Sequence, residues 1–444
     1  MSNLDNFKKP SFISDVAINK TKEKFLPRNI QIDLNNVLKD KLFRFFDELK
    51  DEENRPKAME KFDSMVNELK GQRMKDLYMY RRAGNHIVNL LCHSIPPELV
   101  YAIDNHVPVN VCMAAGELEP YADKYTEGMC PLTRSMIGLN NTGMCVFFNV
   151  ADYAIGNTLC HNIKKSVEIF NETCHDLDLF LLESDQKDEK INVDFKTMEE
   201  WVKHITEGKG FNKESFIKYA KLYTEIREMY KSIRALRKVA NPPINGKNSL
   251  WIQQLLLVSE PNDLLASLQT LKAELENNIK NNIGFNPTGK KKRVMLITPR
   301  IMPPFAEIFR VIENVDAVVV CEEMCMGVTN ITYNIDTLIE IVNDESKTFE
   351  DAAKYILETI DQSECSCSNG FNSERILNRI EEYKVDAVIN YSFVNCPCMG
   401  NKTKGIHDLL IQKGIPSMNF SSNYIEIYDN ADLYMDKIKT FLQV

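Results

Sequence analysis

Apolar and polar residues alternate in blocks that predict strands and helices following one another along much of the chain. The β-branched run VPVNVCM ends next to Cys112 and predicts a buried strand, and a helical pattern opens at Pro131. Strand-like runs follow at Met144–Asn149 and Leu177–Leu182, with a helical pattern from His161 between them. Strands that alternate with helices are typical of α/β domains with parallel sheets.

The same alternation restarts after the polar stretch NNIGFNPTGKKK at residues 281–292. The expected strands of this second unit are Val294–Thr298, Ala317–Cys321, Val385–Tyr391 and Ile415–Phe420. The expected helices are Phe305–Glu313, Phe349–Ile360, Glu374–Glu382, Lys404–Lys413 and Asp432–Leu442. We therefore expect two doubly wound, Rossmann- or flavodoxin-like parallel-sheet domains that face each other across a cleft. The two units are candidates for a distant duplication.

Helical spacing of apolar residues also marks two other regions of the chain. The charge-rich stretch from Asn29 to Asn89 predicts helices, and residues 194–280 are expected to be mostly helical. The expected division is an N-terminal helical segment at 1–92, a first α/β domain with a helical insertion at 93–288, and a second α/β domain at 289–444.

Composition narrows the classes of partner. The chain has 444 residues, with 54 Lys and Arg against 63 Asp and Glu and a net charge of −9, so no overall positive field favours nucleic acid. No run approaches the roughly 20 apolar residues of a membrane helix, and the first residues lack an apolar leader. We expect a cytoplasmic protein that binds neither nucleic acid nor membrane.

A phosphate-binding loop is suggested by spacing but not by context. Gly284 and Gly289-Lys290 have the right separation, yet Lys291 stands where Ser or Thr should hold Mg²⁺. The segment also precedes a predicted strand instead of following one, and no Gly-rich dinucleotide motif occurs elsewhere. We expect no ATP or NAD site of these types in this chain.

Twelve cysteines are unusual for a reducing compartment, where structural disulfides are rare. Cys112, Cys321 and Cys396 fall at the carboxyl ends of predicted strands, the edge where open α/β sheets bind ligands. Cys130 and Cys160 directly precede predicted helices. A helix N-terminus lowers the pKa of a thiol and favours the metal-binding thiolate, so metal or cluster binding is expected at these positions.

Several kinds of thiol site remain open from spacing alone. Zinc would require paired ligands, and only Cys321 and Cys325 have a suitable spacing. A Cys-His nucleophilic pair has no distinctive context, whereas Cys92 and Cys174 resemble packing residues. Ligands scattered over several strand ends suit an iron–sulfur cluster better. The roles of three further cysteines are open: Cys365, Cys367 and Cys398.

Four segments within residues 97–444 carry a family resemblance: VCMAAGELEPYADKYTEGMCPLTRSMIG, MCVFFNVADYAIGNTLCHNIKK, VVVCEEMCMGVTN and VDAVINYSFVNCPCMGNK. They resemble the 2-hydroxyacyl-CoA dehydratase and benzoyl-CoA reductase subunit family, and most closely its double-cubane cluster proteins. The resemblance implies that Cys130, Cys160 and Cys396 hold an iron–sulfur cluster between the two α/β domains. Three positions depart from the family pattern: Leu159, His161 and Pro397.

The resemblance also implies two possible cluster types. One [4Fe-4S] cluster would use three cysteines. A double-cubane [8Fe-9S] cluster would use six, and we favour it because it gives roles to the additional cysteines. Its implied ligands are Cys112, Cys130, Cys145, Cys160, Cys396 and one of Cys321 and Cys325.

The resemblance finally implies a reaction and partners. We expect a homodimeric iron–sulfur oxidoreductase that passes low-potential electrons to a small-molecule substrate, with an ATP-hydrolysing iron–sulfur activator protein as donor. The alternatives are a lyase, as a subunit of a 2-hydroxyacyl-CoA dehydratase, and a non-catalytic electron-transfer protein. Polar residues beside the cysteines, His161, Arg134 and Ser135, are candidates for proton donation.

Overall fold

The fold comes from a computed structural model of the 444-residue chain. The structure describes residues 27–66, 72–91, 95–110, 114–122, 126–158, 160–173, 178–182, 184–187, 190–193, 200–204, 211–256, 258–302, 305–324, 331–359, 372–396 and 399–443.

The first sheet has four parallel strands in the order β2-β1-β3-β4. Their bounds are β1 His86–Leu90, β2 His106–Asn110, β3 Tyr153–Asn157 and β4 Asp178–Leu182. The chain moves outward from β1 to β2 and then returns to place β3 on the other side of β1. The switch point of this doubly wound sheet therefore lies between β1 and β3, and ligands of such sheets bind beyond the carboxyl ends at this point.

The second sheet repeats this arrangement. Its parallel strands are β7 Lys292–Thr298, β8 Ala317–Met324, β9 Ala387–Phe393 and β10 Ser417–Ser422. They are ordered β8-β7-β9-β10, so each sheet places its second strand first, followed by its first, third and fourth. The expected fold class, two doubly wound parallel-sheet units, is confirmed. A separate two-stranded antiparallel ribbon is formed by β5 Ser184–Lys187 and β6 Lys190–Val193.

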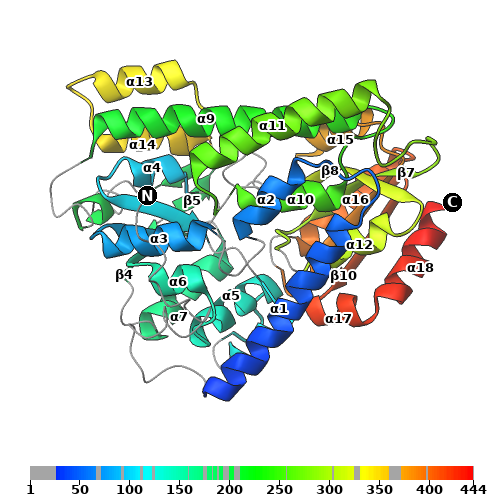
Figure 1. Ribbon diagram of the computed structural model, residues 1–444, viewed down its shortest axis with the longest axis horizontal. Coiled ribbons are helices and arrows are strands. Elements are labelled where there is room, and N and C mark those ends of the chain that lie inside the picture. The colour runs from blue at the N-terminus through cyan, green and yellow to red at the C-terminus, as the bar shows by residue number, and fades with distance from the viewer. Residues whose placement is uncertain are drawn as a thin grey trace, which may run out of the picture.

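Helices surround both sheets (Figure 1). Their bounds are α1 Arg28–Lys50, α2 Met59–Val66, α3 Gln72–Arg82, α4 Pro97–Tyr101, α5 Pro131–Asn141, α6 Val146–Val150, α7 His161–Thr173, α9 Lys213–Ala235, α10 Gly246–Leu255, α11 Pro261–Lys280, α12 Glu307–Glu313, α13 Ile335–Asn343, α14 Phe349–Glu358, α15 Ser373–Glu382, α16 Gly400–Gln412, α17 Tyr424–Asp429 and α18 Ala431–Leu442. Two 3₁₀ helices are η2 Gly116–Tyr121 and η3 Leu236–Lys238.

One of the hydrophobic clusters extends through both sheet units. A single cluster of buried apolar residues includes Ile87 of β1, Leu250 of α10 and Leu296 of β7. Helix α1 joins the units from outside: Lys41 forms an ion pair with Glu117 of η2 in the first unit, while the Phe46 ring packs 4.7 Å from that of Trp251 in α10. The first and second units are therefore held together by packing as well as by the chain.

Two predicted elements are wrong. The helical prediction for the N-terminal stretch holds for α1, α2 and α3 but fails at His86–Leu90, which forms the central strand β1. The predicted strand at Met144–Asn149 is instead the short helix α6, and the strand follows it as β3. Short apolar runs with buried surroundings do not distinguish a strand from a helical turn by periodicity alone.

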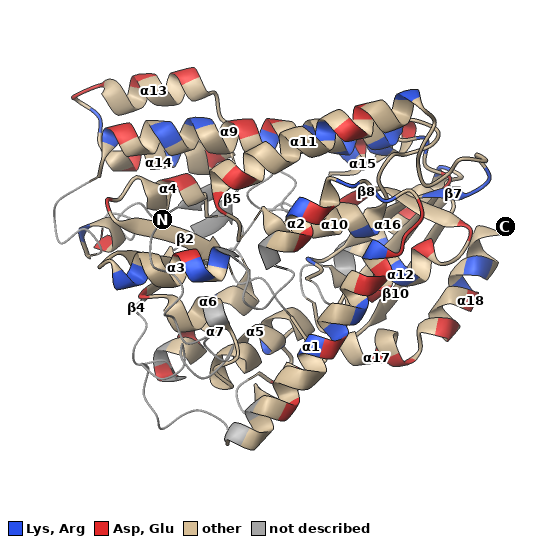
Figure 2. Cartoon of the chain, viewed as in Figure 1, with Lys and Arg blue, Asp and Glu red and all other residues tan. Residues whose placement is uncertain are grey.

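Surface charge is mixed on the outer helices. Figure 2 shows Lys and Arg interspersed with Asp and Glu along α9 and α11. These helices therefore present no basic stripe of the kind that tracks a nucleic-acid backbone. Among the helices that the structure describes, none combines the length and apolarity that a membrane crossing requires.

Candidate functional site

Cys130 occupies the N-cap position of α5, with Pro131 as the first helical residue, as the sequence predicted. Its side chain is only 6% exposed. Cys130 Sγ lies 3.3 Å from Thr133 Oγ1, and that hydroxyl donates a 3.0 Å hydrogen bond to the Cys130 carbonyl. These contacts fix the thiol at the beginning of the helix.

Cys396 approaches Cys130 from the second unit. It follows β9 in a tight turn, in which its N–H donates to Phe393 O at 3.1 Å, and it lies just before α16. The two thiols are close enough to hydrogen-bond, and this bond is the largest cause that raises the pKa of Cys130, followed by burial. The expected lowering of the Cys130 pKa by the helix terminus is therefore wrong, because a neighbouring thiol and burial outweigh it.

Cys160 and Cys396 occupy equivalent places in the two sheets. β3 ends at Asn157 and β9 at Phe393, so each cysteine comes three residues after the third strand of its unit. Each also lies before the next helix. Cys160 directly precedes α7, and Cys396 lies shortly before α16. Both thiols thus lie at the carboxyl edge, next to the switch point where doubly wound sheets bind ligands.

The other predicted cysteines have different surroundings. Cys145 is the N-cap residue of α6 and is buried, and burial raises its pKa to about 11 against the opposing effect of the Phe148 and Phe147 N–H groups. Cys321 was expected at a strand end, but β8 continues to Met324 and leaves Cys321 inside the strand. Burial raises the pKa of Cys321 to about 12.

Strand β8 extends further than predicted because arginines neutralise the two carboxylates that follow Cys321. Arg237 pairs with Glu322, donating to its Oε1 at 2.6 Å, and Arg379 donates to Glu323 Oε2 at 2.5 Å. The strand end therefore falls directly before Cys325. The remaining cysteine predictions lie outside the described residues: Cys92, Cys112, Cys174, Cys325, Cys365, Cys367 and Cys398.

Tyr424, which the sequence reasoning missed, also belongs to this site. It begins α17, and its ring centroid lies 4.6 Å from that of Phe393. Burial is the main cause that raises the pKa of Tyr424 well above its usual value. Negative charge on nearby groups would raise this pKa further, and these groups are Tyr391, Cys130, Glu119 and Cys396. No local motif marks this residue, because its neighbours are distant in sequence.

The three candidate proton donors all belong to helices of the first unit, α5 and α7. Arg134, in the first turns of α5, forms a 3.5 Å ion pair with Glu119. The Ser135 hydroxyl is buried and accepts a 2.5 Å hydrogen bond from the Ala115 N–H. His161 is exposed at the start of α7. The structure thus ties Arg134 and Ser135 to neighbouring segments, and their chemical roles stay predictions.

Gly138 sets the closest approach of α5 to η2. A Cβ atom at this position would lie 1.9 Å from the Leu118 carbonyl oxygen. Gly138→Ala should therefore destabilise the protein by about 1–3 kcal/mol, because the backbone must move to admit the methyl group. Urea unfolding would measure this change.

Gly405→Ala is the matched control, because it is also a helical glycine, in α16, with nothing within 4 Å of the added Cβ. It should be neutral or stabilising by about 0.5–1 kcal/mol, since alanine costs less backbone entropy in a helix. Equal effects of the two substitutions would contradict the packing described for α5.

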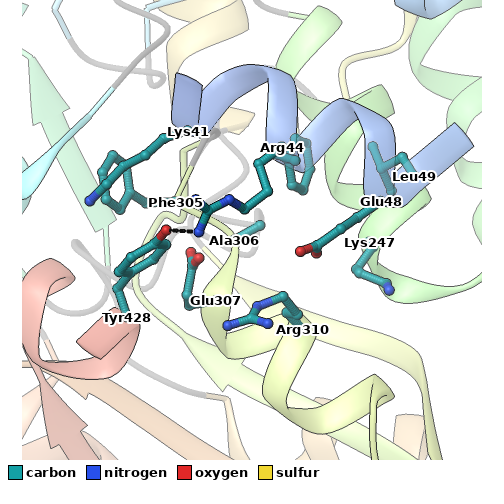
Figure 3. A pocket seen from close by; sticks show the side chains of 11 residues that line it. Lys41, Arg44, Glu48, Leu49, Lys247, Phe305, Ala306, Glu307, Arg310 and Tyr428 are labelled. Carbon is teal, nitrogen blue, oxygen red and sulfur yellow. Dashed lines mark hydrogen bonds between the residues drawn. The ribbon is translucent and has the colours of Figure 1, made fainter. Parts of the chain in front are cut away.

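A charged pocket lies beside the site, bounded by α1, α12 and α17 (Figure 3). Its wall includes Phe305, whose ring centroid is 5.4 Å from that of Tyr424. Burial raises the pKa of Glu307 in this pocket to about 7. The charged lining residues are Lys41, Arg44, Lys247, Arg310, Glu48 and Glu307. Two of its basic side chains are already paired with carboxylates, Lys41 with Glu117 and Lys247 with Glu52, so the pocket carries no clear excess of positive charge.

The described part of the site supplies two thiols from two domains. Within the described ranges, no set of three or more His, Cys, Asp or Glu side chains is arranged to hold a metal ion. A buried thiol, Cys130, next to the half-buried thiol of Cys396 still suits a soft metal or an iron–sulfur cluster. Positive iron would favour the thiolate forms, which the two neutral thiols alone disfavour. The molecule is thus a two-domain α/β protein whose sheets bring cysteines together at their carboxyl edges.

Comparison with known proteins identifies the family. The family model for 2-hydroxyglutaryl-CoA dehydratase, D-component, matches residues 92–443, and the chain belongs to this family. The resemblance inferred from the four sequence segments is therefore confirmed at family level.

Individual relatives are more distant. The Escherichia coli (strain K12) protein YjiM, described as a dehydratase subunit, is 30% identical over 93 residues, which are 21% of this chain. The chain spans about a quarter, 24%, of the length of that relative. The periplasmic zinc binding protein TroA from Treponema pallidum covers 81% of this chain and 99% of its own at 11% identity, but its TM-score of 0.19 supports no argument.

Proposed function

We propose that this member of the dehydratase family is an iron–sulfur oxidoreductase, with a low-potential cluster bound between its two α/β units. The observation that carries the proposal is the contact between Cys130 and Cys396. These residues are 266 positions apart in the sequence, and they belong to the two different sheet units, Cys130 at the beginning of α5 and Cys396 after β9. A buried thiol and a partly buried thiol that meet across two units in this way form a pair suited to ligating a soft metal or cluster.

The proposed ligand set extends from this pair. Cys160 is included because it lies after β3 where Cys396 lies after β9. Cys325 is favoured over Cys321 because in the sequence it comes directly after the last residue of β8, whereas Cys321 lies inside that strand. Cys112 is included because it comes two residues after the last residue of β2. Cys145, at the beginning of α6, would complete a set of six for a double-cubane [8Fe-9S] cluster.

The residues of the chain would bury this cluster and adjust its surroundings. When bound, such a cluster stores and transfers electrons at low potential. The Cys130 end of α5 contributes helix N–H dipoles that favour negative charge, and the apolar rings of Phe393 and Tyr424 exclude water. We propose that an ATP-hydrolysing iron–sulfur activator protein supplies the electrons, and that the chain acts as a homodimer on a small-molecule substrate.

A second candidate function is a 2-hydroxyacyl-CoA dehydratase subunit with one [4Fe-4S] cluster. The match to the family model for 2-hydroxyglutaryl-CoA dehydratase, D-component, favours this alternative. This function would require a sister subunit, so the protein would copurify as a heterodimer.

Iron and acid-labile sulfide counting on anaerobically purified protein separates the candidates. The oxidoreductase proposal predicts about eight irons per chain, with fewer in Cys112→Ala, because the double-cubane cluster uses that cysteine. About four irons, unchanged in Cys112→Ala, would reject the double-cubane cluster in favour of the dehydratase subunit. A protein without iron or sulfide would reject both.

A further inference from the structure

One buried hydroxyl of the site has no hydrogen-bond partner among the residues that the structure describes. The Tyr424 side chain is 2% exposed, and its Oη makes no hydrogen bond with any described residue. A buried hydroxyl without a partner costs free energy, so native structures rarely retain one without a reason. This hydroxyl therefore requires an acceptor that the described chain does not supply.

The surroundings of Tyr424 hold its ring in one place. Phe393 contacts one side with ring centroids 4.6 Å apart, and Phe305 packs edge-on at 5.4 Å. Cys130 and Cys396 lie close enough to Tyr424 that a negative charge on either sulfur would raise the pKa of its phenol. The ring is thus fixed beside the two thiols, and its rotation away from them would cost both aromatic contacts.

We infer that the Tyr424 hydroxyl donates a hydrogen bond to a sulfur atom of the group that Cys130 and Cys396 bind. This inference rests on the proposed function, because it needs a sulfur-containing cluster at the pair. A hydrogen bond to such a sulfur stabilises the reduced, more negative state more than the oxidised state. Tyr424 thereby sets the cluster potential to a less negative value than the cysteines alone would give.

The test compares Tyr424→Phe with a matched control, Tyr391→Phe. Tyr391 is also a buried tyrosine, on β9, but its hydroxyl is paired with Ser422 Oγ at 2.9 Å. Both variants keep their rings and should keep the wild-type iron content. A redox titration followed by electron spin resonance should give a more negative midpoint potential for Tyr424→Phe and the wild-type value for Tyr391→Phe.

A vibrational measurement tests the hydrogen bond itself. Exchange into D₂O replaces the phenolic proton, so the iron–sulfur stretching bands of the wild type and of Tyr391→Phe should shift in resonance Raman spectra. The part of that shift that comes from the phenol should be missing in Tyr424→Phe. A wild-type potential together with the full wild-type shift in Tyr424→Phe would overturn the inference.

Iron-free protein provides a readout that does not depend on the cluster. Tyr424→Phe should melt at the same or a higher temperature than the wild type, because it removes an unpaired buried hydroxyl. Tyr391→Phe should melt at a lower temperature, because it removes the buried hydrogen bond between the tyrosine hydroxyl and Ser422. A lower melting temperature for Tyr424→Phe would show that the hydroxyl already has a partner within the chain, which contradicts the inference.

Iron content separates failure of this inference from failure of the proposed function. Absence of iron from the wild type and both variants would overturn the proposed function, and the inference with it. Loss of iron from Tyr424→Phe alone would overturn the inference, since a hydrogen-bond donor to the cluster is not one of its ligands. Normal iron in Tyr424→Phe together with the wild-type potential and the full deuterium shift would overturn only the inference.

Discussion

Replacing either Cys130 or Cys396 with alanine should lower the iron content of anaerobically purified protein by about tenfold or more. The two thiols come from different units and meet in the structure, so each substitution removes one side of the proposed cluster site. Each substitution removes a ligand at the point where the two units meet, so the remaining thiols should hold the cluster between the sheets much less firmly. Iron and sulfide assays and the visible charge-transfer absorption measure the loss.

Cys321→Ala is the matched control for these substitutions. Cys321 is as buried as Cys130, but it lies inside β8 among apolar side chains such as Met295 and Val388. Its loss should lower stability through a small cavity while iron content stays near the wild-type value. Normal iron in Cys396→Ala together with loss in Cys321→Ala would contradict the proposed site.

Arg237→Met should destabilise the iron-free protein by about 3–5 kcal/mol, because it leaves a buried carboxylate without its main partner. Glu322 is fully buried, and Arg237 pairs with both of its carboxylate oxygens. Burial alone would raise the pKa of Glu322, and the Arg237 guanidinium reverses this so that its pKa is lowered. Urea unfolding measures the loss.

The adjacent Lys238 provides the control for this substitution. Lys238 pairs with Glu382 at 2.7 Å, but both side chains are about half exposed, at 40% and 54%. Lys238→Met should therefore change the stability by only about 0–1 kcal/mol. If Arg237→Met were as mild as Lys238→Met, the buried ion pair would not hold the end of β8 in the way described.

Much of the fold was predictable because its signals are local. The apolar runs that form β7 and β9 are long and bounded by polar turns, and Pro131 marks the start of α5. Strand β1 was missed because it has only five residues and follows a strongly helical region. The end of β8 was missed because the charges of Glu322 suggested a turn, whereas its neutralising arginine comes from a distant helix.

Of the residues of the site, only the cysteines could be predicted from the sequence. Cys130 and Cys396 stand in recognisable sequence contexts, and the structure brings them together. Tyr424 could not be found in this way, since its place beside the thiols depends on how α17 packs against β9. The approach of α5 to η2 at Gly138 is equally a product of tertiary packing. Residues that act through packing carry no local pattern in the sequence.

The most direct test of the central claim is a crystal structure of anaerobically grown crystals, with anomalous diffraction recorded at the iron absorption edge. The account predicts anomalous density within bonding distance of both Cys130 Sγ and Cys396 Sγ, between the two sheets. Iron absent from both sulfurs, or a disulfide joining them in protein that contains no iron, would contradict it.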